Sequence, residues 1–365
     1  MDFKKNFMEL SSFLKEYSVN LVDYNTEPSQ FLLNLDEADY NALIHGFSLS
    51  DAGAPKSILD MESASREVSG FENVYAKAKP FANPEETGVF KNLKRRSVEE
   101  SFNFAKTVIP FLGDKDFVLE VASGGGHLSR YLYHSLSGTR VAGVDKSGPA
   151  VAESMHRAHE NGMDITYFLG DVMEEDIGVM LDGKRNAVVS LHGCGNVSNR
   201  ILSAENADLI AVSPCCYHKI KDNDYFVSGY ASSKRTEFDG GTICSVASSG
   251  IGFFLPSERN RKREEVYSSI VSNGYNISDE YTGILDAAGK KVPSPNTENI
   301  DRIVDVIHGL KKRHSLMRKL ICKPAESLLS TDKAIYLQER GYDANVVEYV
   351  PVILSPRNHL VMGYR

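Results

Sequence analysis

Short apolar runs alternate with helical stretches over the middle of the chain. The runs that are short enough to be single buried strands occupy 117–122, 140–144, 165–169, 186–191 and 208–212. Apolar residues recur at helical spacing over 97–111, 128–137 and 150–161. Strands that alternate with helices form a parallel sheet whose two faces the helices cover. The pattern therefore predicts a doubly wound α/β fold.

The C-terminal pattern is different. Residues 346–354 and 359–364 are predicted to be two strands around a tight Ser-Pro-Arg-Asn turn, which is an antiparallel hairpin. We therefore expect a mostly parallel, seven-stranded, Rossmann-like sheet with this hairpin at its C-terminal end. Residues 299–341 have a helical pattern that Pro324 is expected to break or kink.

The N-terminal part of the chain has helical character. Residues 1–17 are predicted to be a helix with one apolar face, made by Phe3, Phe7, Leu10, Phe13 and Leu14. Residues 35–46 indicate a second helix, and 50–92 are loop-like. We expect 1–92 to be a helical region packed on a core domain, 93–365, which carries an insertion at about 220–300.

A glycine-rich turn follows the first strand of the core domain, in the sequence Val118-Leu-Glu-Val-Ala-Ser-Gly-Gly-Gly-His127. Glycine permits a tight turn and the close approach of a ligand to the backbone. The helix after the turn adds unpaired N–H groups and a favourable dipole. The candidate cofactor-binding residues here are Glu120, Ala122, Gly124 and Gly126.

Carboxylates also end the next two strands. Asp145, followed by Lys146, ends the second strand and is expected to accept both ribose hydroxyls of an adenosine ligand. Asp171 ends the third strand and is expected to accept from an adenine amino group, with Val172 covering the ring. An acid, a glycine turn and two further acids in this order indicate an S-adenosyl-L-methionine site. The alternatives are a dinucleotide-binding domain and a degenerate, empty site. A dinucleotide-binding turn usually has the spacing G-x-G-x-x-G, and Ser129 stands here in place of its last glycine, which argues against that alternative.

Cysteine and histidine cluster after the fourth and fifth strands. Leu191-His-Gly-Cys-Gly-Asn196 follows one strand and Ser213-Pro-Cys-Cys-Tyr-His218 follows the other, so both segments are expected at one edge of the sheet. Three interpretations are open: a methyl-acceptor pocket, a zinc site, and purely structural residues. The pocket is favoured and no metal is assigned; its candidate catalytic residues are His192, Tyr217 and His218, and His192 also faces the cofactor.

Several segments resemble the methyltransferase-like protein 25 family, which includes a relative named for a ribosomal RNA adenine dimethylase domain. The resemblance covers most of 90–365. Its segments are Lys94-Arg-Arg-Ser-Val-Glu-Glu100, Gly124-Gly-Gly-His-Leu-Ser-Arg130, Val144-Asp145, Leu191-His-Gly-Cys-Gly195, Cys215-Cys-Tyr-His-Lys219, Leu354-Ser-Pro-Arg-Asn358 and Leu316–Gly341. A related pairing of His-x-Cys-Gly with Cys-Cys occurs in a family of transfer RNA 2′-O-methyltransferases.

The resemblance implies a class I methyltransferase that uses S-adenosylmethionine. It implies methyl transfer to a nitrogen or oxygen nucleophile, and RNA or protein is the favoured acceptor. The Asn-Pro-Pro-Tyr type of motif that is expected for adenine N6 chemistry is missing. The segment Ser213-Pro-Cys-Cys-Tyr217 resembles it superficially, but it follows the fifth strand rather than the fourth. The alternatives are a catalytically weak scaffold with this fold and an RNA-binding assembly factor.

Composition and charge narrow the class of protein. Of 365 residues, 42% are hydrophobic and 25% charged, so a sizeable core is possible. The 41 Lys and Arg against 49 Asp and Glu give a net charge of −8, which excludes a strongly basic nucleic-acid coat. The sequence has no long apolar run and no apolar signal core, so we expect neither a membrane span nor secretion. Five cysteines in so long a chain are typical of reduced thiols in a cytoplasmic or nuclear protein.

Three basic clusters interrupt the acidic balance, at 91–97, 259–263 and 311–319. Arg259, Arg261 and Arg263 belong to the second cluster. Together the clusters are expected either to form an RNA-binding rim or to be solvated helix faces.

Overall fold

The computed structural model describes most of the expected core domain and the N-terminal helix. The described residues are 1–16, 68, 70–74, 95–221, 225–234, 243–244, 247, 322–351, 354–355 and 357–365. Nearly all of them belong to one compact unit, made of Met1–Lys15, Val68–Ser248 and Pro324–Arg365. A second unit comprises Glu16–Glu67 and Ser249–Lys323 and falls almost wholly outside the described residues.

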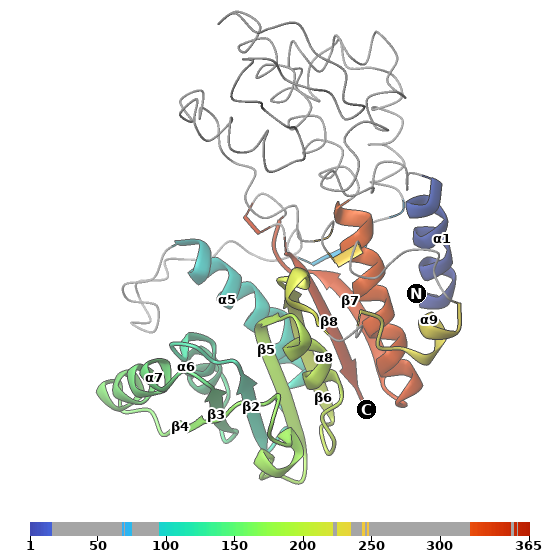
Figure 1. Ribbon diagram of the computed structural model, residues 1–365. Helices are drawn as coiled ribbons and strands as arrows, with labels where there is room; N and C mark the ends of the chain where they lie inside the picture. Colours follow the sequence, from blue (N-terminus) through green and yellow to red (C-terminus); the bar gives the residue numbers. More distant parts are fainter. Residues whose placement is uncertain are drawn as a thin grey trace, which may run out of the picture. The chain divides into compact units, whose positions relative to one another are not determined.

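Eight strands form one sheet in the order β1-β7-β8-β6-β5-β2-β3-β4 (Figure 1). Their bounds are β1 Glu72–Asn73, β2 Phe117–Val121, β3 Arg140–Asp145, β4 Thr166–Leu169, β5 Asn186–Cys194, β6 Leu209–Cys215, β7 Asp343–Glu348 and β8 His359–Tyr364. Only β8 runs antiparallel to its neighbours, β6 and β7. The mostly parallel sheet with a C-terminal hairpin is confirmed.

The helices follow the predicted alternation. Their bounds are α1 Phe3–Glu16, α5 Arg95–Val108, α6 His127–Ser135, α7 Gly148–Glu160, α8 Asn196–Leu202 and α9 Gly229–Lys234, and residues 322–339 are also helical. The helix α7 begins where the Ser147 hydroxyl accepts a hydrogen bond from the Ala150 N–H at 3.4 Å, with Pro149 in the first turn. The capping residues at the start of α7 therefore favour a helix at the position where the alternation of strands and helices predicts one.

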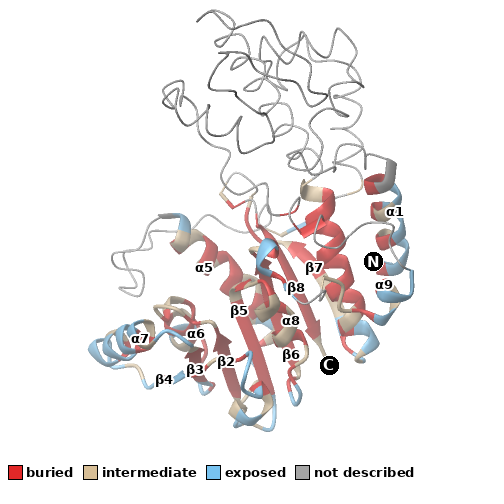
Figure 2. Cartoon of the chain, viewed as in Figure 1, coloured by how far each residue is buried: buried red, intermediate tan, exposed pale blue. Residues whose placement is uncertain are grey.

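The central strands carry the core (Figure 2). Every residue of β2 and β6 is buried, and apart from Glu120 in β2 and Ser213 in β6 their sequences are apolar rather than alternating. Strands that are buried on both faces have this pattern. The strand β4 at the edge of the sheet buries only Tyr167, which reaches inward toward the turn after β2.

Two expectations about the sheet were wrong in detail. The sheet has eight strands rather than seven, because the two-residue strand β1 pairs in parallel with Val347 and Glu348 of β7. The C-terminal turn is not tight. The strand β7 ends at Glu348, shortly before Pro351, which has no N–H to donate to a ladder.

The segment between β7 and β8 is partly built into the interior. The Asn358 side-chain amide donates to the Val350 carbonyl at 2.9 Å, and the Tyr349 N–H donates to the Asn358 carbonyl at 3.1 Å. The side chain of Arg357 is only 3% exposed. The described part of this connection therefore places Arg357 and Asn358 inside the protein.

The predicted N-terminal helix and its apolar face are both confirmed. All five of its predicted apolar residues are buried. The ring of Phe7 meets Phe226 and Tyr230 edge-to-face, at centroid distances of 5.8 and 6.0 Å. The Asn6 side-chain amide donates to the Thr331 hydroxyl at 3.1 Å, which connects α1 with the helical residues 322–339. Pro324 lies in the first described turn of that helix, where its missing N–H is tolerated.

Several predictions fall outside the described residues. These are the helix at 35–46, most of the loop-like region 50–92, most of the insertion 220–300, the helical pattern over 299–321 and the basic clusters at 259–263 and 311–319. Among the residues that are described, no helix is both long enough and apolar enough to cross a membrane.

Candidate functional site

The glycine-rich turn after β2 has three residues with positive φ angles, and it is in close contact with Tyr167 at Gly126. Ala122, Gly124 and Gly126 all have positive φ angles, of 57°, 51° and 65°. A Cβ on Gly126 would lie 2.4 Å from the Tyr167 hydroxyl, whereas a Cβ on Gly124 would meet nothing within 4 Å. Gly126 is therefore required by Tyr167, and Gly124 faces open space that a ligand could occupy. Ala122 has a left-handed conformation that costs an L-residue about 1–2 kcal/mol.

Tyr167 reaches the turn because the strand between them has a glycine. Tyr167 on β4 pairs with Gly143 on β3, and a Cβ on Gly143 would lie 2.7 Å from the tyrosine ring. The Tyr167 hydroxyl then lies 3.1 Å from the Ser129 hydroxyl of α6. The side chain thus crosses β3 and contacts the turn after β2.

Glu120 is enclosed beneath this turn. Its carboxylate accepts hydrogen bonds from the Ser129 N–H at 2.8 Å and the Ser129 hydroxyl at 2.5 Å. Burial raises the pKa of Glu120 to about 7, although the bonds from Ser129 oppose that shift. The carboxyl group therefore fixes the start of α6 and is close to half-protonated near neutral pH.

Asp145 fastens the end of β3 to the turn after β2. One of its carboxylate oxygens accepts from the Gly124 N–H at 2.8 Å, and the other accepts from the Ser147 N–H at 2.9 Å. Each carboxylate oxygen has two lone pairs, so acceptor capacity is left for ligand hydroxyls. The structure thus brings Gly124 and Asp145 together, as a ribose site requires.

Asp171 and its neighbours lie at the adjacent strand end. The Asp171 carboxylate accepts from the Met173 N–H at 3.0 Å and lies 3.8 Å from the Lys146 ammonium. Val172 is buried, and its carbonyl accepts from the Arg200 guanidinium at 3.1 Å. With Asp145 and the open space at Gly124, these residues fit an adenosine-bearing ligand that lies across the ends of β2, β3 and β4.

His192 is the irregular residue of β5. The register between β5 and β6 shifts between Leu191 and Gly193, and His192 has a φ of 65°. Such a bulge re-aims a side chain, and it commonly occurs next to functional sites. The imidazole is 36% exposed, and its Nε2 lies 3.3 Å from the Glu100 carboxylate of α5.

Glu100 was missed by the sequence analysis as a site residue. Burial acts to raise the pKa of Glu100, but the bond and charge of His192, the Ser355 hydroxyl and the Arg96 charge outweigh it and lower that pKa. The Arg96 guanidinium lies 3.3 Å from the same carboxylate and 3.3 Å from the Ser355 hydroxyl. The available signal was that Arg96, Glu100 and Ser355 all fall in segments that carry the family resemblance.

Tyr217 and His218 have opposite environments. Tyr217 is fully buried with the Arg357 guanidinium 5.7 Å from its ring centroid, and burial raises the pKa of its hydroxyl well above the usual range. His218 is exposed. Both residues lie in the 3-10 turn Tyr217–Lys219 that follows β6, and of these two only His218 is exposed to solvent.

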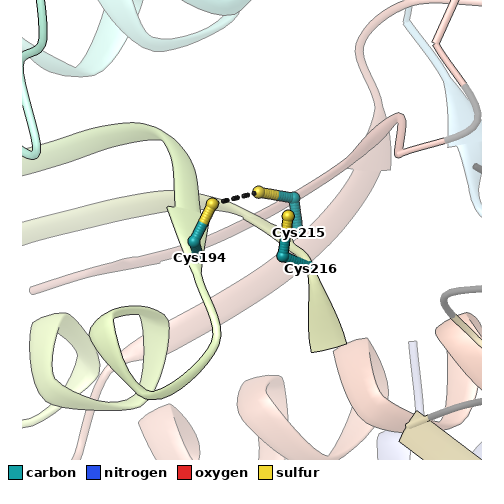
Figure 3. Close-up of side chains that lie close together, drawn as sticks. All are labelled: Cys194, Cys215 and Cys216. Atoms are coloured by element: carbon teal, nitrogen blue, oxygen red, sulfur yellow. Dashed lines mark hydrogen bonds between the residues drawn. The ribbon is translucent and has the colours of Figure 1, made fainter. Parts of the chain in front are cut away.

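Three cysteines meet at the ends of β5 and β6 (Figure 3). The sulfur atoms of Cys194, Cys215 and Cys216 all lie within 4.8 Å of one another, and those of Cys194 and Cys215 are 3.0 Å apart. The hydrogen bond from the Cys215 thiol lowers the pKa of Cys194 to about 6, and the same bond raises the pKa of Cys215. Of these two cysteines, Cys194 is therefore the more acidic thiol.

We expect alanine to be tolerated very differently at Gly124 and Gly126. Gly126→Ala introduces a clash with Tyr167 besides the positive φ, and it should lower the free energy of unfolding by about 3 kcal/mol. Gly124→Ala adds only backbone strain and should cost about 1 kcal/mol. Urea unfolding of both variants measures this; equal losses would contradict the contact between Gly126 and Tyr167.

The stability of the protein should depend on the ionisation of Glu120. Because folding raises the pKa of Glu120 to about 7, its stabilising contribution is complete below about 4.5 and is lost as the pH rises through 7. This group alone should lower the free energy of unfolding by about 3 kcal/mol between those limits. Glu120→Gln should remove that part of the slope in unfolding experiments from pH 5 to 8. If the dependence of the unfolding free energy on pH is the same in Glu120→Gln as in the wild type, burial does not raise the pKa of this carboxyl group.

The central part of the chain is similar to a known protein family. Residues 93–223 match the model of a family described as a methyltransferase domain. A curated relative from Mus musculus, named glutathione S-transferase C-terminal domain-containing protein, is 20% identical over 283 residues, which are 77% of this chain and 35% of that protein. The protein of the same name from Homo sapiens matches to the same extent. The chain thus spans about a third of the length of these relatives.

Solved structures with local similarity cover less of the chain. The PH0226 protein from Pyrococcus horikoshii OT3 is 15% identical with a TM-score of 0.28, over 36% of this chain and 62% of that one. An S-adenosylmethionine-dependent methyltransferase from Clostridium acetobutylicum is 12% identical with a TM-score of 0.25, over 35% and 55%. The match of residues 93–223 to a methyltransferase domain and the order of the strands agree with the expected doubly wound fold.

Proposed function

We propose that this chain transfers a methyl group from S-adenosylmethionine to a nitrogen or oxygen nucleophile of RNA or protein. The proposal rests above all on the hydrogen bond between the Asp145 carboxylate and the Gly124 N–H, at the edge where β2 and β3 end. This bond joins a carboxylate that can accept ribose hydroxyls to a turn that leaves open space for a ligand. The match of residues 93–223 to a methyltransferase domain supports it.

The residues around the cofactor bind and orient it. Asp145 accepts the ribose hydroxyls, Asp171 accepts from the adenine amino group and Val172 covers the ring. Glu120 holds the turn from below through Ser129. The bound cofactor supplies an activated methyl group on a sulfonium, so the protein mainly positions the two reactants.

His192 is the best candidate to act on the acceptor. Its Nε2 faces the buried Glu100 carboxylate, and an imidazole held in this way carries its basic nitrogen at Nδ1. Nδ1 is then the ring nitrogen that can accept the proton that a nucleophile gives up. Arg96 and Ser355 are positioning residues, because they contact Glu100 and each other rather than the acceptor.

The acceptor is proposed from the segments that carry the family resemblance. The methyltransferase-like protein 25 resemblance, and the pairing of His-x-Cys-Gly with Cys-Cys in transfer RNA 2′-O-methyltransferases, favour RNA slightly. His218 is exposed beside the thiol cluster, and it is the proposed contact to such an acceptor. Tyr217 instead supports the turn from inside, since it is fully buried beside Arg357.

A scaffold that binds the cofactor without turnover is the second candidate. The observation that favours it is the strained backbone of Ala122, where a glycine would relieve the left-handed conformation. An RNA-binding assembly factor belongs to the same class of alternatives. Both predict cofactor affinity or RNA retention without methyl transfer.

We expect calorimetric titration to detect S-adenosylmethionine binding that depends on Asp145. Asp145→Ala should weaken binding at least about 10-fold, which is 1.4 kcal/mol, because the ribose loses its acceptor and the turn loses its anchor. Asp164→Ala is the matched control, since Asp164 is exposed just before β4, at the opposite end of that strand. If the folded Asp145→Ala variant binds S-adenosylmethionine with wild-type affinity, the assignment of this cofactor site is wrong.

Methyl transfer should depend on His192 without affecting cofactor binding. In assays with labelled cofactor and separated RNA and protein fractions, His192→Ala should lower turnover by about 100-fold or more. Glu100→Gln should lower turnover less, because it leaves the imidazole in place but removes the carboxylate that orients it. If turnover by His192→Ala equals that of the wild type, another group takes the proton. Binding without turnover in the wild type would favour the scaffold.

A further inference from the structure

We propose that Cys194, Cys215 and Cys216 form a binding site for a soft divalent cation, for which Zn²⁺ is the physiological candidate. The three sulfurs come from the ends of two neighbouring strands, and all lie within 4.8 Å of one another (Figure 3). This inference does not rest on methyl transfer, because it concerns only the thiols and the ion.

The backbone at Cys216 is what brings the third sulfur into the cluster. Consecutive residues of a strand point to opposite faces, so Cys215 and Cys216 would ordinarily diverge. Cys216 instead follows the end of β6 with a φ of 48° and a ψ of 46°. Such a left-handed conformation costs about 1–2 kcal/mol for a residue other than glycine, and strain of this kind is typically stored at functional sites.

The two turns that carry the cysteines are held together before any ion binds. The Gly195 N–H donates to the Cys215 carbonyl at 3.1 Å, which joins the turn after β5 to the end of β6. The Asn196 side chain accepts from the Lys221 N–H at 2.8 Å and so spans the same two segments. A Cβ on Gly195 would lie 2.9 Å from Lys219, so the turns are in close contact. The thiols therefore need little rearrangement to act together.

The spacing of the sulfurs is compatible with tetrahedral coordination. Two thiolates that each lie about 2.3 Å from one zinc ion are about 3.8 Å apart. Cys194 and Cys215, now 3.0 Å apart, have to separate by roughly 0.8 Å to reach that value. On binding, three sulfur–metal bonds form, and those sulfurs that still carry a proton release it to the solvent.

The number and accessibility of the thiols indicate the kind of ion and site. Thiolates select zinc, cadmium and copper(I) over magnesium and calcium. Cys215 is buried, whereas Cys194 and Cys216 are partly exposed. Three protein ligands with an accessible side leave a fourth coordination position open, as in exchangeable rather than closed structural zinc sites. A disulfide between Cys194 and Cys215 would leave Cys216 without a role.

The test uses the full chain, reduced and stripped of metal by a chelator under anaerobic conditions. Titration with Cd²⁺ should produce a thiolate-to-metal charge-transfer band that saturates at one equivalent, and Zn²⁺ should displace the ion. Cys194→Ser and Cys216→Ser should each weaken binding at least about 10-fold. Cys322→Ser is the matched control, because this cysteine lies outside the cluster, and it should bind like the wild type.

Three results would overturn the proposal. They are the absence of a saturable band, wild-type affinity in both cluster variants, and a Cys194–Cys215 disulfide that forms in place of metal binding. Cofactor titration of the same variants checks that they are folded. It also separates failure of the metal site from failure of the proposed methyltransferase.

Discussion

Tyr167, Ser129 and Glu120 form the chain of contacts on which the cofactor edge of this protein depends. The Tyr167 side chain crosses Gly143 to reach the turn after β2, where its hydroxyl contacts the Ser129 hydroxyl. The Ser129 hydroxyl in turn donates a hydrogen bond to the buried carboxylate of Glu120. Three strands and the start of α6 are therefore fixed by one tyrosine and one serine. The glycines of the turn are explained as much by this internal contact as by the ligand.

A second group of contacts organises the neighbouring strand ends. The bulge at His192 turns the imidazole toward Glu100, and the residues that follow bring Cys194 to Cys215. Both groups lie at the carboxyl ends of parallel strands, where doubly wound folds bind their ligands. His192 and Cys216 both have positive φ angles, so backbone strain is found at this edge of the sheet, as is typical of functional sites.

The sequence predicts the alternation of strands and helices well, because apolar periodicity is a local signal. It also predicts that Gly124 meets Asp145, since strand ends of a parallel sheet share one edge. It does not predict that Glu100 holds His192, because that contact spans 92 residues and depends on how α5 packs. Likewise, Ser-Pro-Arg-Asn has the composition of a tight turn, and only the tertiary structure places Arg357 inside beside Tyr217.

The two-residue strand β1 has a consequence for association between chains. Among the described residues, β1 is the strand that pairs with the outer side of the six-residue strand β7, at the end of the sheet. Exposed edges of that length are templates on which another chain can extend the sheet. Glu72 and Asn73 cover part of this edge with a strand too short to propagate pairing, and both of their side chains are exposed and polar. Among the described residues, this dipeptide therefore shields the carboxyl-terminal end of β7 from pairing with another chain.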